Sequence, residues 1–190
     1  VAHLNPLTAG TICSMTLLVE GAGGILAGYF SDQSYTKYGR RRPFVLISGI
    51  AGSLLLCLLF IDVSSLGTGM VLYYYIVATL YWAAYSFYFI PYIALGGEMS
   101  DDYQERIGIW SYCRIYSILG SFIGTASPVF LVGVFMERGL SPKESWLTFS
   151  VIFAAIAISC TLITWRATSG REQLYCDLGV RPRKEPLRSL

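Results

Sequence analysis

Long apolar stretches separated by short polar breaks occupy most of the chain. Five of them reach about 20 residues, the length that crosses about 30 Å of hydrocarbon at about 1.5 Å per residue in a helix. They cover Thr8–Phe30, Pro43–Ile61, Met70–Gly96, Ile107–Phe135 and Trp146–Trp165. The pattern predicts an all-α, polytopic membrane bundle of five transmembrane helices, followed by a polar, basic tail or loop over residues 166–190.

Composition supports a membrane protein and argues against an enzyme. Of the 190 residues, 54% are hydrophobic and only 14% are charged. His3 is the single histidine, the carboxylates form no cluster, and the polar breaks on the less basic side of the membrane are too short for a catalytic domain. The cysteines lack metal-site spacing, so we expect no metal. We likewise expect no cofactor, apart from the coupling ion, and no nucleic-acid partner.

The basic residues predict the orientation of the helices in the membrane. Because successive breaks lie on alternate sides, Lys and Arg can be counted for each side, and twelve fall on one side against two, Arg138 and Lys143, on the other. We therefore expect the loops at 31–42 and 97–106 and the C-terminal tail to be cytoplasmic, in a multi-pass protein of the cell membrane.

Two polar breaks carry motifs. The stretch GYFSDQSYTKYGRRRPF, Gly28–Phe44, resembles the cytoplasmic motif of the major facilitator superfamily, in which G-x-x-x-D precedes G-R-[RK]. Its six-residue spacer and GRRRPF ending are similar to the glycoside-pentoside-hexuronide cation symporter family, which is melibiose permease-like, and also resemble sucrose transporters. The stretch Pro91–Arg114 is similar to that family's junction between helices four and five.

The resemblance implies a fold and an activity. The five stretches would be helices two to six of a twelve-helix fold, so residues 1–165 would form a partial N-terminal six-helix bundle lacking its first helix, and 166–190 the central cytoplasmic loop. As an N-terminal-half fragment, the chain would need the missing C-terminal half as a partner, besides the lipid bilayer. The implied activity is alternating-access transport of a small-molecule substrate, a sugar or glycoside.

Glu20 is the candidate ion-coupling residue. It lies twelve residues, about 18 Å of helix, before Asp32 and thus in mid-membrane, where a carboxylate is costly unless it is protonated, paired or hydrated. The family carries two aspartates one turn apart here, whereas this chain has Gly24 at the second position. We therefore expect a proton rather than sodium as the coupling ion; a purely structural, protonated Glu20 is the alternative.

The candidate substrate-binding residues lie on two helices. Five tyrosines from Tyr74 to Tyr92 share one face of the third stretch, which suits a sugar-like ligand or, equally, simple packing. The resemblance places Tyr85 and Tyr92 at or beside the family's binding region, Phe89 at a sugar-binding aspartate, and Arg114 at a sugar-binding arginine. Arg114 could alternatively neutralise Glu20.

A third group of residues is expected to work a cytoplasmic gate. Asp32 ends one helix and the arginines begin the next, where the helix dipole opposes each charge, so Asp32 needs a partner such as a loop arginine. The acidic break after the third stretch could pair with this basic loop when the gate closes, or be solvated. The candidates are Asp32, Arg40, Arg41, Arg42, Glu98, Asp101, Asp102, Glu105 and Arg106.

The sequence is also compatible with two functions other than sugar transport. The first is transport of another amphipathic solute such as a lysolipid, because relatives of this family carry such cargo. The second is a multi-pass scaffold or receptor without transport, in which neutralising Glu20 and Arg114 would leave function intact.

Overall fold

The computed structural model is built from five long helices. It describes residues 6–169 except 35, 37, 65, 66, 68 and 101. The helices are α1 (Pro6–Gln33), α2 (Arg42–Leu59), α3 (Gly69–Glu98), α4 (Tyr103–Glu137) and α5 (Pro142–Ala167). Each contains the corresponding predicted apolar stretch except for a residue or two at the C-terminal end of α2, and no strand occurs among the described residues.

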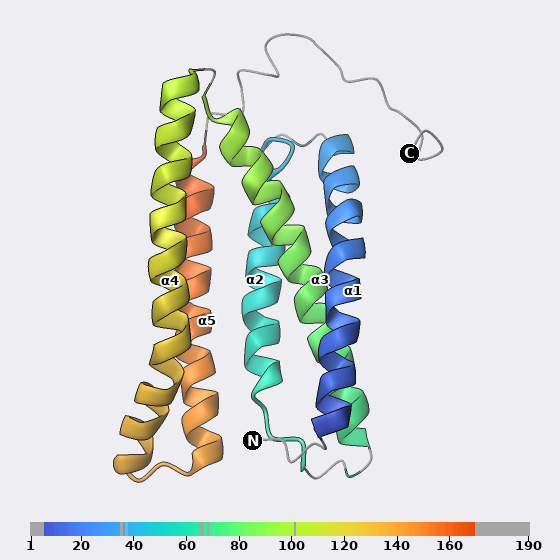
Figure 1. Ribbon diagram of the computed structural model, residues 1–190, viewed down its shortest axis with the longest axis vertical. Helices are drawn as coiled ribbons and strands as arrows, with labels where there is room; N and C mark the ends of the chain where they lie inside the picture. Colours follow the sequence, from blue (N-terminus) through green and yellow to red (C-terminus); the bar gives the residue numbers. More distant parts are fainter. Residues whose placement is uncertain are drawn as a thin grey trace.

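The helices run up and down beside one another. Figure 1 shows the ends of α1, α3 and α5 together at one end of the molecule and the α2–α3 and α4–α5 connections at the other. The centre of the packing is α3, which contacts α1 and α2; α2 in turn contacts α5, and α5 contacts α4. Successive connections between the helices therefore lie at alternate ends of the bundle, as the count of basic residues on each side of the membrane assumes.

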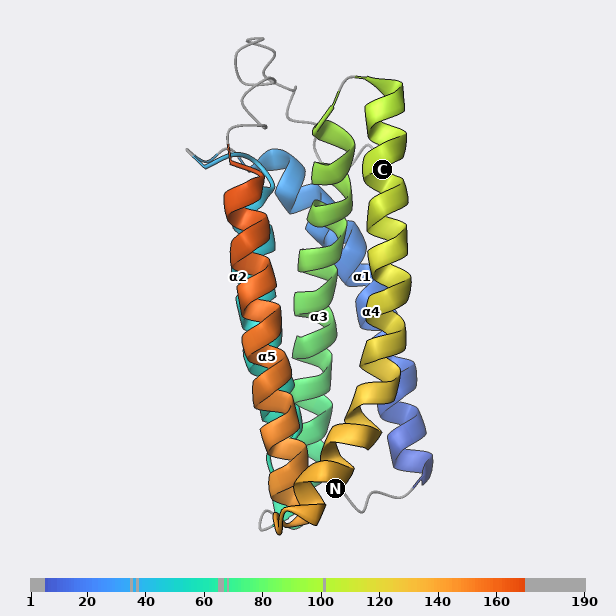
Figure 2. The same ribbon diagram turned by 90° about the vertical axis from the view of Figure 1, so that its left-hand side faces the viewer.

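Local sequence signals determine where the helices start and bend. Ser141 accepts a hydrogen bond from the backbone of Glu144, whose side chain accepts one in return, so a capping box begins α5. Asp102 caps α4 by accepting from the Gln104 N–H at 3.0 Å. Pro128 lies inside α4, which bends toward its C-terminal end in Figure 2.

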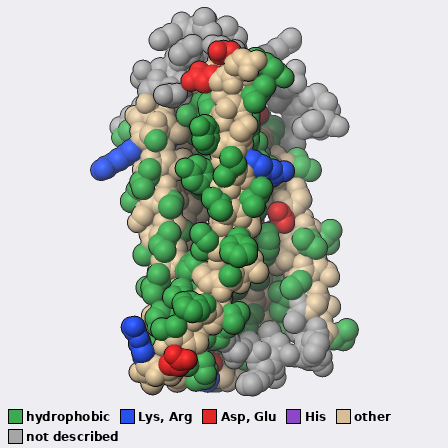
Figure 3. Space-filling model, turned by 60° about the vertical axis from the view of Figure 1, so that its left-hand side comes forward, with side chains coloured by type: hydrophobic (Ala, Val, Ile, Leu, Met, Phe, Trp, Pro, Cys, Tyr) green, Lys and Arg blue, Asp and Glu red, His purple; other side chains and the backbone are tan. Residues whose placement is uncertain are grey.

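Many large apolar side chains are exposed, and few are buried in a core. All five helices are long and apolar enough to cross a membrane, and in the most apolar window of α4 only 6% of residues are buried. Figure 3 shows hydrophobic side chains over much of the middle of the visible face, with few charged groups among them. Such a surface suits contact with hydrocarbon, so the fold is that of a multi-pass membrane protein.

Candidate functional site

A cavity between α1 and α3 brings together residues that the sequence analysis selected separately. It measures about 560 Å³, and Glu20 from α1 lines it opposite Tyr85 and Phe89 from α3. The remaining lining residues are small or mostly apolar: Leu17, Gly21, Gly24, Ile25, Ser86 and Ile90. One acid therefore shares an otherwise largely apolar space with two aromatic rings.

The two aromatic rings of this cavity form a continuous wall. The rings of Tyr85 and Phe89, one turn apart on α3, are stacked with centroids 5.5 Å apart and planes inclined by 13°. Gly24 and Gly28 face Ile90 on α3, and a Cβ on either would lie 3.7–3.8 Å from that side chain. Both glycines therefore lie at the contact between α1 and α3, where a methyl group would meet Ile90 at an ordinary van der Waals distance.

The two other predicted substrate residues lie elsewhere. Tyr92 lines a small space between the ends of α3 and α4, with its hydroxyl 3.9 Å from the Cys113 sulfur. Arg114 is exposed on α4, and among the described residues it forms no ion pair. The structure therefore assembles Glu20, Tyr85 and Phe89 but does not join them with Arg114 or Tyr92 in one cavity.

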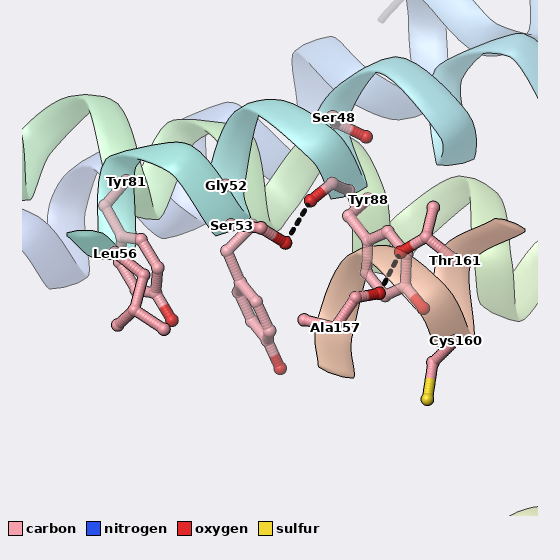
Figure 4. A pocket seen from close by; sticks show the side chains of 11 residues that line it. Ser48, Gly52, Ser53, Leu56, Tyr81, Tyr88, Ala157, Cys160 and Thr161 are labelled. Carbon is pink, nitrogen blue, oxygen red and sulfur yellow. Dashed lines mark hydrogen bonds between the residues drawn. The ribbon is translucent and has the colours of Figure 1, made fainter. Parts of the chain in front are cut away.

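A second cavity, of about 310 Å³, lies between α2, α3 and α5. Figure 4 shows Tyr81, Tyr88, Ser53, Cys160 and Thr161 around it, and Tyr85 lines it as well as the first cavity. The Ser53 and Thr161 hydroxyls donate to carbonyls of their own helices at 2.7 and 2.8 Å. Their lone pairs remain free to accept hydrogen bonds from a ligand or from another part of the protein.

The sequence analysis found only the tyrosines of this second cavity. Its α2 wall consists of Leu56 and of four small residues at helical spacing, Ser48, Gly49, Gly52 and Ser53. That run is visible in the sequence, but small residues in a membrane helix more often signal ordinary packing. Periodicity alone could not single it out.

Asp32 has the partner that its position at a helix end requires. Its carboxylate accepts a hydrogen bond from Arg41 at 2.7 Å and lies 3.4 Å from the guanidinium of Arg40. The pairing of Asp32 with arginines of its own loop is thus confirmed. Whether the pair works as a gate stays a prediction.

Arg42 is separate from the other two arginines. It is buried, with its guanidinium 4.4 Å from the Trp165 ring centroid, and it donates to the carbonyls of Trp165 at 2.5 Å and Tyr38 at 3.2 Å and to the Thr168 hydroxyl at 3.2 Å. This cation lies at the C-terminal end of α5, where the helix dipole favours positive charge. Its contacts therefore join α2 to α5.

The acidic break after α3 is occupied by local contacts. Asp102 caps α4, Glu105 accepts from the Ser100 hydroxyl at 2.5 Å, and Arg106 donates to the Ser100 carbonyl at 2.9 Å. Glu98 is the last residue of α3, and Asp101 lies outside the described residues. Pairing of this loop with the basic loop stays a prediction for another conformation.

The residue types that line the cavity limit the chemistry that the site could support. Among the described residues, no three His, Cys, Asp or Glu side chains gather as metal ligands would. A carboxylate in a largely apolar cavity can carry a proton or attract a cation, and adjacent rings can stack on a ligand. The cavities and the five long helices are features of a membrane protein that binds small solutes between its helices.

Comparison with known proteins agrees with this class. The model of the family described as MFS/sugar transport protein matches residues 1–187, and the chain belongs to that family. An uncharacterized symporter of Bacillus subtilis is 29% identical over 168 residues, covering 87% of this chain and 36% of the relative. The isoprimeverose transporter of Lactiplantibacillus pentosus is 26% identical over 191 residues, covering 100% of this chain and 40% of the relative.

A relative with a different cargo is also similar. The sodium-dependent lysophosphatidylcholine symporter 1-A of Danio rerio is 27% identical over 149 residues, covering 76% of this chain and 28% of the relative. The chain thus spans less than half the length of each of these relatives. They are symporters or transporters by name, in agreement with the family resemblance described from the two loop motifs.

Proposed function

We propose that this chain is part of a symporter that moves a sugar or glycoside by alternating access and that couples this movement to a proton gradient through Glu20. The observation that carries the proposal is the cavity that Glu20 lines together with the stacked rings of Tyr85 and Phe89. The family and the isoprimeverose transporter support a sugar as the cargo.

A single acid favours the proton over sodium. Sodium binding needs several oxygen ligands at once, whereas one carboxylate is enough to carry a proton. Of the residues that the structure describes, Glu20 is the only charged one that lines the cavity. The sodium dependence named for the lysophosphatidylcholine relative makes sodium the alternative that the experiment must test.

The proposal also covers further substrate contacts, a cytoplasmic gate and the location of the protein in the cell membrane. Tyr92 and Arg114 would join the substrate site only when the rest of the transporter, including its C-terminal half, is present. The Asp32, Arg40 and Arg41 cluster would act as a cytoplasmic latch together with the acidic loop. The loops at 31–42 and 97–106 would face the cytoplasm, and the protein would reside in the cell membrane.

The test is uptake by the full-length transporter in proteoliposomes. We expect an inward proton gradient to drive accumulation of isoprimeverose, the cargo named for one relative, and Glu20→Gln to reduce that accumulation at least about tenfold. Exchange of substrate across the membrane without a gradient should persist, because glutamine imitates the protonated acid. Glu137→Gln, which changes an exposed acid at the end of α4, is the matched control and should behave as wild type.

Several outcomes would contradict parts of the proposal. Accumulation driven by sodium without any proton dependence would exclude proton coupling. Uptake of lysophosphatidylcholine in place of isoprimeverose would make the lysolipid the cargo, which the largely apolar lining of the cavity also permits. Gradient-driven uptake by Glu20→Gln equal to wild type would remove the coupling role of Glu20.

A further inference from the structure

Ser86 lies where α1 and α3 approach each other closely. Its hydroxyl donates to the main-chain carbonyl of Glu20 at 3.1 Å, and the residue is only 2% exposed. A Cβ on Gly23 would lie 3.2 Å from both the Cβ and the Oγ of Ser86. A side chain at Gly23 would be in tight contact with Ser86 and would have to push it back, so the glycine favours this close approach.

The Ser86 hydroxyl has a hydrogen-bond acceptor on its own helix and does not need the one on α1. The Trp82 carbonyl on α3 also lies 3.1 Å from the Ser86 hydroxyl and can accept its proton. Ser150 on α5 shows this simpler arrangement, since it is fully buried and its hydroxyl donates to Leu147 of its own helix at 2.7 Å. Ser86 differs because it also reaches a second helix, at the residue that carries the acid.

Fixing the main chain at Glu20 limits where its carboxylate can lie. The Glu20 carbonyl is held by Ser86, and three residues later Gly23 is held in contact with the same side chain, so nearly one turn of α1 is anchored to α3. Ser86, Glu20 and Tyr85 line the same cavity. A displacement of about 1 Å in a functional group can change its activity by about a hundredfold, so this anchoring matters for a group that must meet a cation.

We propose that Ser86 is a positioning residue, which anchors α1 at Glu20 and thereby sets the place of the Glu20 carboxylate in the cavity between α1 and α3. The inference rests on the proposed function in one respect, because it assumes that Glu20 is the coupling group. It adds a residue on α3 to the coupling machinery. Ser86 acts through Glu20 and needs no contact with the cargo.

The first measurement needs no substrate. Dicyclohexylcarbodiimide reacts with carboxyl groups in apolar surroundings, and mass spectrometry of the peptide that contains Glu20 gives its labelling rate in the full-length transporter in proteoliposomes. We expect Ser86→Ala to change this rate about fivefold or more, because the released α1 main chain moves the carboxyl. Ser150→Ala should label at the wild-type rate, and Ser86→Thr, which keeps the hydroxyl, should return the rate to that of wild type.

The second measurement is gradient-driven uptake of isoprimeverose, with proton and sodium concentrations varied separately. Ser86→Ala should raise the cation concentration for half-maximal uptake about tenfold, while the KM for the sugar stays within about twofold. A serine that merely stabilised the fold would lower the amount of folded protein and leave both constants unchanged.

A swap variant covers the case in which Ser86→Ala does not fold. Gly23→Ala combined with Ser86→Gly refills the space between the helices without the hydroxyl, so it should fold and show the same altered labelling rate. A wild-type labelling rate in Ser86→Ala, or in the swap, would overturn the positioning role. The proposed function fails independently, if Glu20→Gln retains gradient-driven uptake while the labelling result holds.

Discussion

Asp62 and Lys143 illustrate how single residues join distant parts of the chain. Lys143, in the first turn of α5, donates to the Asp62 carboxylate in the connection after α2, and the Ser64 N–H donates to the same carboxylate at 3.1 Å. The hydrogen bond from Lys143 is the main cause that lowers the pKa of Asp62 from 3.8 to about 2, with the bonds from Ser64 as further causes. The aspartate therefore stays charged throughout the physiological pH range.

The sign of this shift gives a pH prediction. Because the pKa of Asp62 is lower in the folded protein, its contribution to stability is complete above about pH 4 and is lost as the pH falls toward about 2. The difference in thermal midpoint between wild type and Asp62→Asn should thus be constant from pH 8 to pH 5 and narrow only below about pH 4. Thermal unfolding in detergent at several pH values measures it.

A difference that already disappears between pH 7 and pH 5 would contradict this pairing. Glu137→Gln is a suitable control, since Glu137 is exposed at the end of α4. Its thermal midpoint should differ little from wild type at every pH, because exposed carboxylates contribute little.

At the scale of the helix, α2 and α5 are joined along their whole length. Arg42 and Trp165 connect them at one end, and the Phe60 and Trp146 rings, stacked with centroids 5.6 Å apart, connect them at the other. Between these ends, Gly49 lies against Thr161. The two helices are therefore expected to move as one body.

Gly49 provides the test of this close packing. A Cβ there would lie 2.7 Å from Cγ2 and 2.8 Å from Oγ1 of Thr161, which is too close, so either the Thr161 side chain or the two helices would have to shift. Gly49→Ala should lower the free energy of unfolding by about 1–3 kcal/mol. Thermal unfolding of the solubilised transporter would show this as a lower thermal midpoint.

The matched control removes the obstructing atoms. In the double variant Gly49→Ala with Thr161→Ala, the new Cβ meets only the position of the Thr161 Cβ, at 3.3 Å, and most of the loss should be recovered. A single variant as stable as wild type would show that the two helices are not in firm contact. A double variant no better than the single one would place the defect outside this contact.

At the scale of the whole molecule, the charged loops and the short connections lie at opposite ends of the bundle. The loop after α1, the break after α3 and the end of α5 lie together, while the connections after α2 and α4 lie at the far end (Figure 1). In the sequence, twelve of the fourteen Lys and Arg residues lie from the break after α1 to the start of α2, in the first half of α4 or after Trp165, and only Arg138 and Lys143 lie around the connection after α4. By the positive-inside rule, we predict that this end faces the cytoplasm.

Single cysteines can test this assignment in a transporter without its native cysteines. With a membrane-impermeant thiol reagent added outside intact cells, Ser64→Cys in the connection after α2 should be labelled. Gln104→Cys in the first turn of α4 should react only after the membrane is opened. Ser159→Cys, in the membrane-spanning part of α5, is the control that should react in neither case. Labelling of Gln104→Cys in intact cells would reverse the orientation.

The amino-acid sequence by itself determined the five helices, their order and their approximate ends. An uninterrupted apolar stretch in hydrocarbon must satisfy its backbone hydrogen bonds internally, so length and hydrophobicity suffice to predict a helix. Glu20, Tyr85 and Phe89 could also be selected from the sequence, because a charge in mid-membrane and aromatic rings on one face are rare enough to be noticed.

Only the tertiary structure decided which of these residues meet. It joined Glu20 with Tyr85 and Phe89, left Arg114 exposed, and separated Arg42 from Asp32 by placing it beside Trp165. It also revealed Ser86, which looks in the sequence like any other serine of a membrane helix. Helical periodicity shows which face of its own helix a side chain occupies, but contacts between helices depend on how the whole bundle packs, and no local pattern contains that information.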